Sequence, residues 1–530
     1  MAKITIDGKE WEFEEGMNLF EACTIARGGE KLPHFCYHPG LPVVGVCRMC
    51  QVEIEGVPKL QIACNSTVRD GMVVHTRTER VQNTVRQILG FHLLHHPVDC
   101  PICDQVGECA LQNQYMKYGL YEADIEVGDK LAKRKVQLIG PLVMLDAERC
   151  VLCARCTRFT HHLTKTDEMG IFNRGDHSEI GVAPGLTLDN DYSLNVVDIC
   201  PVGALTSRDF RFEKRVYWLK NTESVCPGCA TGCNMIIGHS GGRLYRQQPR
   251  ENLQVNDYWM CDHGRLLYHS VQGDDRLLEP KIKEGGEQAP VGWDHLWNQL
   301  KERVEALGEE GNLVLVGSPH ATLEELYAFK SLLQDAVGGS VLGHRLTGSE
   351  MDRADEFLLS ADRTPNDTGA RLLGYADFSA QDLAAAASKK TLLVILQNDL
   401  ASFDPAAAEA IEGYGLVAYV GCRENATSGL ADFVLAGRSY AEKEGTIVNK
   451  DQRAQTLHKA IDGPVQSEED WFLIARMGEL FGHAPSWRAQ HDLSSELSAR
   501  IPEFAAIAGG IPKEGVSLAQ GAGVEEVERG

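Results

Sequence analysis

The sequence predicts α+β domains in the N-terminal half and an α/β domain in the C-terminal half, on three observations. Cysteine is concentrated early, since 16 of the 17 cysteines precede residue 262. Short alternating strands open the chain, with a tight turn at Asp7-Gly8 between the first two. After about residue 280, apolar strand-like runs alternate with helix-like runs, which is typical of a largely parallel sheet covered by helices.

Composition narrows the functional classes. A chain of 530 residues suggests three or four domains, and a net charge of −23 argues against nucleic acid and against an anionic membrane surface as partners. No apolar run is long enough for a signal peptide or a bilayer span, so we expect no direct membrane insertion. Without an export signal, so many cysteines indicate metal binding rather than disulfides.

The N-terminal elements follow from periodicity. KITID and KEWEF read as paired strands, and a helix follows with Leu19, Ala22, Cys23 and Ala26 on one face. QVEIEG (51–56) reads as another strand. Residues 79–95 read as a helix that Pro97 terminates, and 120–145 as a loop with short strands.

The C-terminal elements alternate in type. WDHLWNQLKERVEAL and TLEELYAFKSLLQDAV are expected helices, and NLVLVG, TLLVILQ and LVAYV are expected strands. Neither a GxGxxG nor a GxxxxGK[ST] motif is present, so no nucleotide fingerprint is found. The last residues, QGAGVEEVERG, are expected to be a frayed acidic tail.

The first cysteine set has the spacing C-x10-C-x2-C-x13-C. Four thiolates on a loop that bends at Gly40 and Gly45 suit a [2Fe–2S] cluster, and amide groups of such a loop can point at the sulfurs. A structural zinc site is the alternative, although zinc ribbons usually show two C-x2-C pairs. The members of this set are Cys36, Cys47, Cys50 and Cys64.

The second set has the spacing H-x3-C-x2-C-x5-C. Three cysteines leave one iron corner of a [4Fe–4S] cluster open, and a neutral imidazole can fill it. His92 falls on the apolar face of the expected helix and reads as a core histidine. The pattern alone does not decide between His96, His95 and no histidine ligand at all. The candidate ligands are His96, Cys100, Cys103 and Cys109.

The third set combines C-x2-C-x2-C with a distant Cys-Pro. Such a triplet surrounds one face of a [4Fe–4S] cluster and the Cys-Pro supplies the remaining corner, so we assign all four cysteines to one cluster. They are Cys150, Cys153, Cys156 and Cys200.

The fourth set has the spacing C-x2-C-x3-C-x27-C, again four thiolates for a [4Fe–4S] cluster. A hairpin with a Gly241-Gly242 turn is expected between its third and fourth members. The set consists of Cys226, Cys229, Cys233 and Cys261. Cys23 and Cys422 remain, and both are expected to be inert structural thiols.

The order of these sets resembles the G subunit of bacterial respiratory complex I, the NADH-quinone oxidoreductase. The stretches that carry the resemblance cover residues 1 to about 270: PHFCYHPGLPVVGVCRMC, HHPVDCPICDQVGECALQ, RCVLCARCTRF, DICPVGALT, CPGCATGCN and MCDHGR. It implies a β-grasp ferredoxin-like [2Fe–2S] domain (1–78), a [4Fe–4S] domain with one histidine and three cysteine ligands (79–119), and a ferredoxin-like [4Fe–4S] domain with four cysteine ligands (120–215). A molybdopterin-type [4Fe–4S] domain (219–275) and a shortened molybdopterin-oxidoreductase-like α/β domain (276–530) would follow.

The resemblance also implies a function and makes His96 the expected imidazole ligand. An NADH/FMN-binding subunit would pass electrons to the [2Fe–2S] cluster, then to the Cys150 cluster, then to the His96 cluster, and on through quinone-side iron–sulfur subunits. The Cys226 cluster is expected off this path. The subunit would not be catalytic alone and would lie on the cytoplasmic side of the bacterial inner membrane, among other peripheral-arm subunits.

The C-terminal half is similar to molybdopterin oxidoreductases through WDHLWNQL, VGSPHATLEELYAFKSLL and AEKEGTIVNKDQRAQ, but it departs from them. It is far shorter than a full molybdopterin enzyme. It has no plausible catalytic cysteine, because Cys422 is followed by Arg423. Asp262-His263 follows Cys261 at the place where such enzymes often carry a lysine. We therefore expect no molybdopterin. Two other readings stay open: an electron-transfer subunit of a soluble NAD-linked hydrogenase or formate dehydrogenase, and a zinc-stabilised interaction module.

Overall fold

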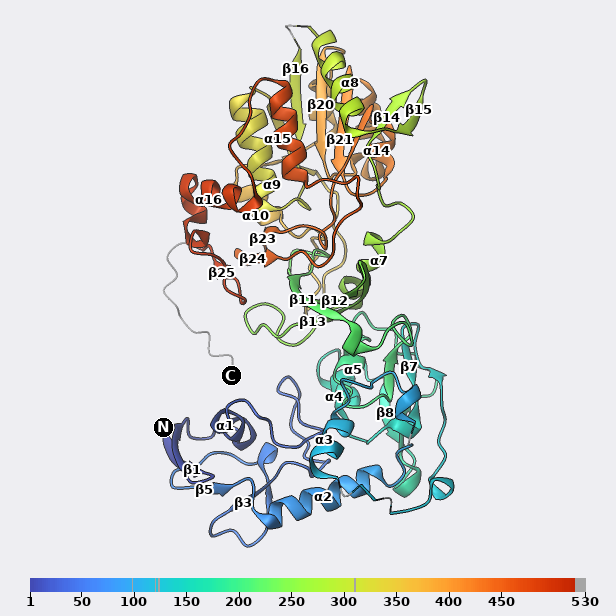
Figure 1. Cartoon of the computed structure of the whole chain (residues 1–530), viewed down its shortest axis with the longest axis vertical. Helices are drawn as coiled ribbons and strands as arrows, with labels where there is room; N and C mark the ends of the chain where they lie inside the picture. Colours follow the sequence, from blue (N-terminus) through green and yellow to red (C-terminus); the bar gives the residue numbers. More distant parts are fainter. Residues whose placement is uncertain (98, 120, 123, 309–310, 520–530) are drawn as a thin grey trace. The chain divides into compact units, whose positions relative to one another are not determined.

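The structure, a computed structural model, describes residues 1–97, 99–119, 121–122, 124–308 and 311–519 (Figure 1). The chain divides into two compact units, Met1–Leu219 and Lys220–Gly530. The expected acidic tail, residues 520–530, lies outside the described residues. No helix in the described ranges combines the length and the apolar character that a bilayer crossing requires.

The first unit opens with a five-stranded sheet in the order β2-β1-β5-β3-β4. The predicted turn is confirmed, since Asp7 and Gly8 have φ angles of 47° and 82° between the paired strands β1 and β2. Asn18 caps α1, which buries Leu19 and Cys23 against the sheet as predicted. The elements are β1 (Ala2–Ile6), β2 (Lys9–Phe13), α1 (Leu19–Ala26), β3 (Gln51–Ile54), β4 (Gln61–Ile62), η1 (Ala63–Asn65) and β5 (Val73–His75).

The rest of the first unit is built from short elements around the second and third cysteine sets. The predicted helix at 79–95 is confirmed as α2 (Glu79–Leu93), capped by Thr78. Two small sheets follow, with the orders β10-β7-β6 and β8-β9. The elements are η2 (Cys100–Ile102), α3 (Ala110–Tyr118), η3 (Val127–Asp129), β6 (Gln137–Leu138), β7 (Val143–Leu145), η4 (Ala147–Arg149), α4 (Arg155–His162), β8 (Met169–Phe172), η5 (Gly175–His177), β9 (Glu179–Val182), α5 (Asn195–Asp198), β10 (Leu205–Ser207) and η6 (Val216–Trp218).

The second unit begins with a three-stranded sheet that holds the fourth cysteine set. The predicted hairpin is confirmed, because Gly241 and Gly242 have positive φ angles between β12 and β13. The elements are β11 (Lys220–Val225), β12 (Asn234–Ser240), β13 (Arg243–Pro249), α6 (Asp262–Leu266) and α7 (Tyr268–Val271).

A seven-stranded sheet follows in the order β15-β14-β22-β21-β20-β16-β17. The five strands from β22 to β17 in this order are parallel, as predicted. At the other edge, β14 and β15 form an antiparallel hairpin that pairs with β22. The elements are β14 (Lys281–Glu284), β15 (Glu287–Pro290), α8 (Trp293–Ala306), β16 (Asn312–Val316), α9 (Leu323–Ala328), the π-helical η7 (Phe329–Ala336), β17 (Ser340–Gly343), β18 (Arg345–Leu346), α10 (Asp367–Leu372), β19 (Asp377–Phe378), α11 (Ala380–Ala385), β20 (Thr391–Leu396), α12 (Leu400–Phe403), α13 (Pro405–Glu412), β21 (Leu416–Gly421), α14 (Ala426–Leu430), β22 (Phe433–Ala436), β23 (Gly445–Val448), β24 (Arg453–Leu457), α15 (Asp470–Leu480), α16 (Gln490–Arg500), η8 (Pro502–Ile507) and β25 (Val516–Ser517).

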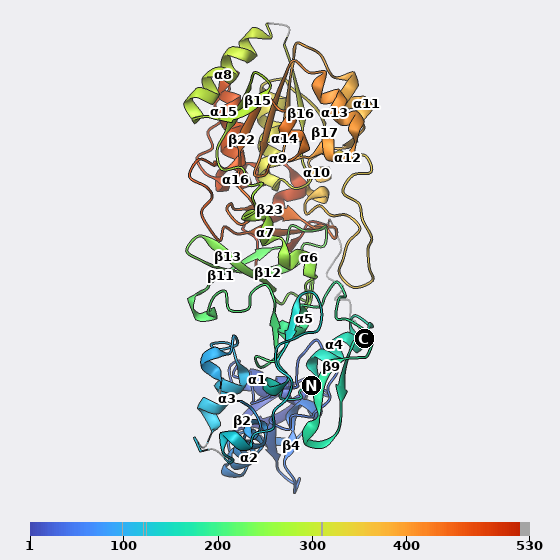
Figure 2. The same cartoon turned by 90° about the vertical axis from the view of Figure 1, so that its right-hand side faces the viewer.

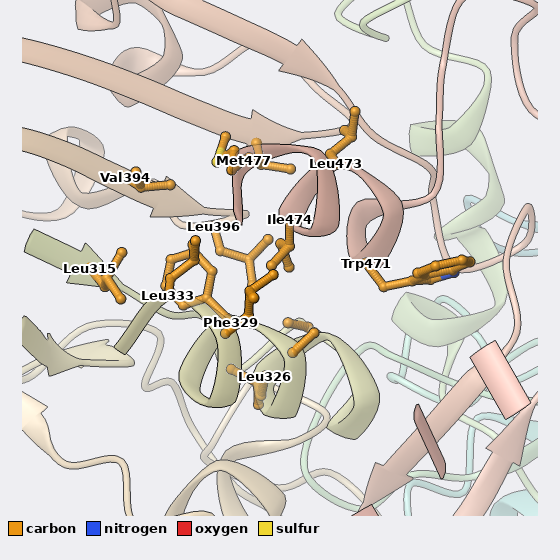
Figure 3. Close-up of a cluster of buried hydrophobic side chains, with 14 of the residues drawn as sticks. Leu315, Leu326, Phe329, Leu333, Val394, Leu396, Trp471, Leu473, Ile474 and Met477 are labelled. Atoms are coloured by element: carbon orange, nitrogen blue, oxygen red, sulfur yellow. The ribbon is translucent and has the colours of Figure 1, made fainter. Parts of the chain in front are cut away.

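Helices cover both faces of this sheet, so its central strands β20, β21 and β22 are buried along their whole length. On β16, Leu313 and Leu315 face one core, and Val314 and Val316 face the other, which is the two-residue period of a strand. The first core lies beneath α8, α9 and α15, and the second beneath α11 and α13 (Figure 2). In the first core, strand residues such as Leu396 meet Phe329 and side chains of α15 (Figure 3).

Candidate metal centres

The first cysteine set lies on the loop between α1 and β3 and on the turn η1, and its members are buried. Arg48 and Gly45 take positive φ angles, so the backbone curls around the sulfurs as expected. Phe35 N donates to Cys47 Sγ at 3.4 Å. Hydrogen bonds from the thiols of Cys47 and Cys64 lower the pKa of Cys36, so these sulfurs point toward one another.

The second set follows α2. The Nδ1 atom of His96 is buried and has no hydrogen-bond partner among the described residues, and burial lowers the pKa of its ring to about 4. The imidazole is therefore neutral near pH 7, and its Nδ1 atom is available to bind a metal. The other two histidines are engaged: His95 Nδ1 accepts from Leu131 N at 3.3 Å, and His92 Nε2 lies 3.1 Å from the carbonyl of Cys47.

The cysteines of this set sit on short turns beside that imidazole segment. Cys100 lies in η2 and is exposed, Cys103 is buried, and Cys109 is the N-cap residue of α3. The ion pair between Arg149 and Asp99, at 2.7 Å, acts electrostatically on both His96 and Cys103. The structure thus brings the predicted histidine and cysteines into one electrostatic environment.

The third set lines one pocket, to which Val151, Ile180, Val202 and Leu205 contribute apolar walls. Leu152 and Ala154 have positive φ angles, which turn the backbone between successive cysteines. Leu152 N donates to Cys150 Sγ at 3.3 Å. The pocket is lined by Cys150, Cys153, Cys156 and Cys200.

Burial also fixes the chemistry of this pocket. It raises the pKa of Cys153 to about 11, because a thiolate in an apolar pocket lacks solvation. Deprotonation at neutral pH therefore needs a bound cation, and binding of such a cation releases protons.

The fourth set closes over the start of α6. Gly228 N donates to Cys226 Sγ at 3.4 Å, and Gly264 N to Cys261 Sγ at 3.3 Å. Burial raises the pKa of Cys261 to about 11. A Cβ atom on Gly264 would lie only 2.8 Å from Cys226 Sγ, so glycine leaves room here for the sulfurs and whatever they hold.

The spacing of the thiols differs from that of a zinc site. Tetrahedral zinc with bonds of about 2.3 Å places its sulfurs about 3.8 Å apart. Across the described residues, no three cysteine sulfurs lie within 4.8 Å of one another. The described sulfurs therefore do not form a compact tetrahedral zinc site.

One group of three side chains does meet that 4.8 Å limit: His344, Asp367 and Asp377. Its carboxylates are already paired, since Arg371 contacts both aspartates at 2.7 Å and Arg345 contacts Asp367 at 3.2 Å. We read it as an ion-pair network that ties α10 to β18 and β19. The two leftover cysteines also match expectation, because burial raises the pKa of Cys23 to about 12 and also raises that of Cys422.

Several families match successive parts of the chain. They are a 2Fe-2S iron-sulfur cluster binding domain (residues 1–79), the NADH-ubiquinone oxidoreductase-G iron-sulfur binding region (86–124), the NADH-quinone oxidoreductase subunit 3 ferredoxin-like domain (140–206), the molybdopterin oxidoreductase Fe4S4 domain (219–273) and molybdopterin oxidoreductase (366–480). These matches define the class: an iron–sulfur protein whose [2Fe–2S] and [4Fe–4S] domains precede a molybdopterin-oxidoreductase domain. The predicted fold class is confirmed, whereas the exact domain boundaries remain predictions.

The relatives are more specific. The chain is 38% identical to the G subunit of NADH-quinone oxidoreductase from Rickettsia bellii over 334 residues, which are 63% of this chain and 48% of the relative. The G subunit from Streptomyces coelicolor is 35% identical over 67% of this chain and 42% of its own length. The 78 kDa subunit of NADH-ubiquinone oxidoreductase from Neurospora crassa is 37% identical over 62% of this chain and 44% of its own.

Over these residues the chain is similar to the G subunit of NADH-quinone oxidoreductase, the protein that the sequence motifs resemble. It spans about half the length of the curated relatives it matches. Among solved structures, a NAD+-reducing [NiFe]-hydrogenase chain matches at 26% identity over 41% of this chain and 91% of its own, with a TM-score of 0.36.

Proposed function

We propose that the chain is an electron-transfer subunit of an NADH:quinone oxidoreductase. The observation that carries the proposal is that one cysteine set lines a single buried pocket, within a series of sets whose order matches the iron–sulfur domains of the G-subunit relatives.

The site assignment is part of the proposal. One [2Fe–2S] cluster and three [4Fe–4S] clusters would each store a single electron, which requires no nucleotide site on this chain. The buried, unpartnered Nδ1 of His96 supports its role over that of His95. The proposed ligands are Cys36, Cys47, Cys50 and Cys64 for the [2Fe–2S] cluster, and His96, Cys100, Cys103 and Cys109; Cys150, Cys153, Cys156 and Cys200; and Cys226, Cys229, Cys233 and Cys261 for the [4Fe–4S] clusters.

The partners follow from this role. An NADH/FMN-binding subunit would supply electrons, and quinone-side iron–sulfur subunits of the peripheral arm would receive them, on the cytoplasmic side of the inner membrane. The relatives are named as subunits of NADH-quinone oxidoreductase, which supports an assembly of several subunits.

We also propose that the second unit binds no molybdopterin. In open α/β sheets, ligands bind at the carboxyl ends of the strands. Here that edge holds a buried ionic network: Lys443 Nζ lies 2.6 Å from Glu325 and 3.3 Å from Asp470, and Gln397, directly after β20, donates to both carboxylates. A pterin would have to displace charges that are satisfied internally. Elemental analysis should accordingly find no molybdenum or tungsten in the purified protein.

The cluster content is testable on the full chain, purified without oxygen. We expect about fourteen irons with matching sulfide, and EPR signals of both cluster types after reduction. Cys64→Ser should remove the [2Fe–2S] signal, and Cys23→Ser, a matched change of a buried cysteine outside the four sets, should leave every signal intact. Zinc in place of iron, with no acid-labile sulfide, would refute the proposal.

The electron path is tested in the assembled complex. Cys153→Ala should abolish NADH-to-quinone turnover per assembled complex, because its cluster would lie on the path. Cys229→Ala should instead reduce folding and assembly. The complexes that do assemble should still turn over, because we place its cluster off the path. Equal loss of turnover in both assembled variants would put the Cys226 cluster on the path. The isolated chain should not oxidise NADH with ferricyanide.

A further inference from the structure

Two arginines connect the first and third cysteine sets. Both lie on α4, the helix that begins between Cys153 and Cys156. Arg158 donates to the carbonyls of Cys36 and Pro42, each at 2.5 Å, and through Nε to the carbonyl of Ala154 at 3.0 Å. One side chain therefore joins the backbone of a [2Fe–2S] ligand to the backbone between two [4Fe–4S] ligands.

Arg155 makes a parallel connection. It donates to the carbonyl of Tyr37, beside Cys36, and to the carbonyl of Ile199, beside Cys200, the latter at 2.9 Å. Its Nε is buried and has no partner among the described residues. The two guanidinium groups thus cross-link the Cys36 loop to two segments of the third set, Arg155 to the segment before Cys200 and Arg158 to the segment between Cys153 and Cys156.

The charge of these arginines is not neutralised by carboxylates. Their hydrogen bonds all go to backbone carbonyls, and in the described part of the chain neither forms an ion pair with an acidic side chain. Arg158 is only 8% exposed. Arg149, just before the same cysteine triplet, differs, because it is paired with Asp99 at 2.7 Å and Asp146 at 3.4 Å.

The groups that face the two guanidiniums are the cysteine sulfurs themselves, which become thiolates when they bind iron. Arg155 interacts electrostatically with Cys153, Cys200 and Cys36, and Arg158 with Cys36 and Cys153. Each cluster gains one negative charge on reduction. A fixed positive charge in a poorly solvated interface stabilises the reduced form more than the oxidised form, and so raises the reduction potential.

We propose that Arg155 and Arg158 form a positive bridge between these two sites, which raises the reduction potentials of both clusters and holds their loops at a fixed separation. The inference rests on the proposed clusters. When one electron passes between the two sites, one is oxidised and the other reduced. No bond forms or breaks, and both guanidiniums keep their protons. The two arginines are positioning residues and contact the ligand loops, not a substrate.

The test is an anaerobic redox titration of the full chain, followed by EPR, in the wild type, Arg155→Met, Arg158→Met and the double variant. Methionine keeps the apolar stem but removes the charge. At the wild-type midpoint, the reduced-to-oxidised ratio of both clusters should fall about fivefold or more in the double variant. Arg77→Met removes an equal charge from an exposed site in the same unit and should change neither ratio.

The lysine variants separate charge from hydrogen bonding. Arg155→Lys and Arg158→Lys keep the charge, so their midpoints should stay close to wild type even where the [2Fe–2S] signal broadens. If a methionine variant loses the [2Fe–2S] cluster while its lysine counterpart keeps it, the requirement for charge is supported. Loss in both variants, or intact clusters with unshifted midpoints in the double variant, overturns the inference. Absence of cluster signals in the wild type would instead refute the proposed function.

Discussion

Gly264→Ala tests the fourth cysteine set. Two opposing effects act there, the higher helix propensity of alanine and the contact of its new Cβ atom with Cys226. Gly264 lies in α6, and alanine in a helix is favoured over glycine by about 1 kcal/mol. The new Cβ would lie 2.8 Å from Cys226 Sγ and 3.0 Å from Met260 Cε. Ordinary contacts begin at about 3.5 Å, so the sulfur must move by about 0.7 Å or more.

The steric effect should win. Overpacking a buried site costs about 1–3 kcal/mol, more than the helix gain, and a cluster tolerates little displacement of a ligand. We expect the iron content of the anaerobically purified chain to fall by about four per chain, from about fourteen to about ten. The EPR signals of the other three clusters should remain.

The matched control is Gly429→Ala. Gly429 also lies in a short helix of the same unit, α14, but a Cβ there would meet nothing within 4 Å. This variant should keep all its iron and unfold at the same or a slightly higher temperature. A full complement of iron in Gly264→Ala, with an unchanged spectrum, would show that no cluster occupies the space beside Cys226.

Three further predictions concern the fold itself. Cys23 should resist iodoacetamide at pH 8 in the native chain and react after denaturation, because burial raises its pKa to about 12. Ile474→Ala should lower the unfolding free energy of the second unit by about 2–5 kcal/mol, measured calorimetrically, since the side chain is fully buried in its core. Asp367→Asn should cost about 2 kcal/mol at pH 7: although burial raises the pKa of Asp367, hydrogen bonds from His344 and Arg371 hold it at about 2. Because this pKa is depressed in the folded state, the cost should persist above about pH 4 and vanish as the pH falls through 2, and a pH-independent cost would contradict the reasoning.

The sequence was sufficient for the elements with strong periodicity. The hairpin at Asp7-Gly8 and the helix at 79–95 were predicted because local turn chemistry and one apolar face determine them. The edge hairpin β14–β15 was not predicted, although its Gly285-Gly286 turn is a local signal of the same kind as Gly241-Gly242. Its pairing with β22, about 150 residues away, could be found only from the tertiary structure. The π-helical segment η7 was also missed. It continues directly from α9, and α9 begins with an ordinary capping box at Thr322, so the whole run was predicted as one α-helix.

Cysteine spacing indicated candidate ligands, but it left the choice of histidine open. Only tertiary structure shows that Leu131, 36 residues away, engages His95 and that the buried Nδ1 of His96 lacks a partner among the described residues. A spacing rule describes one loop at a time. It cannot report hydrogen bonds that reach a histidine from elsewhere in the chain.

The same limit explains why the contacts of Arg155 and Arg158 could not be predicted from the sequence. In the sequence they are two of the residues interleaved with a cysteine triplet, and their partners lie about 120 positions earlier. Arginine suits such a position because it remains charged when buried and its planar group donates several hydrogen bonds in fixed directions. Lysine would supply the charge with one donor centre, and could not span from Ala154 to both Cys36 and Pro42. If electrons do cross between these sites, the residues that set the driving force are therefore found in the contacts between loops, and the ligand spacing alone does not contain them.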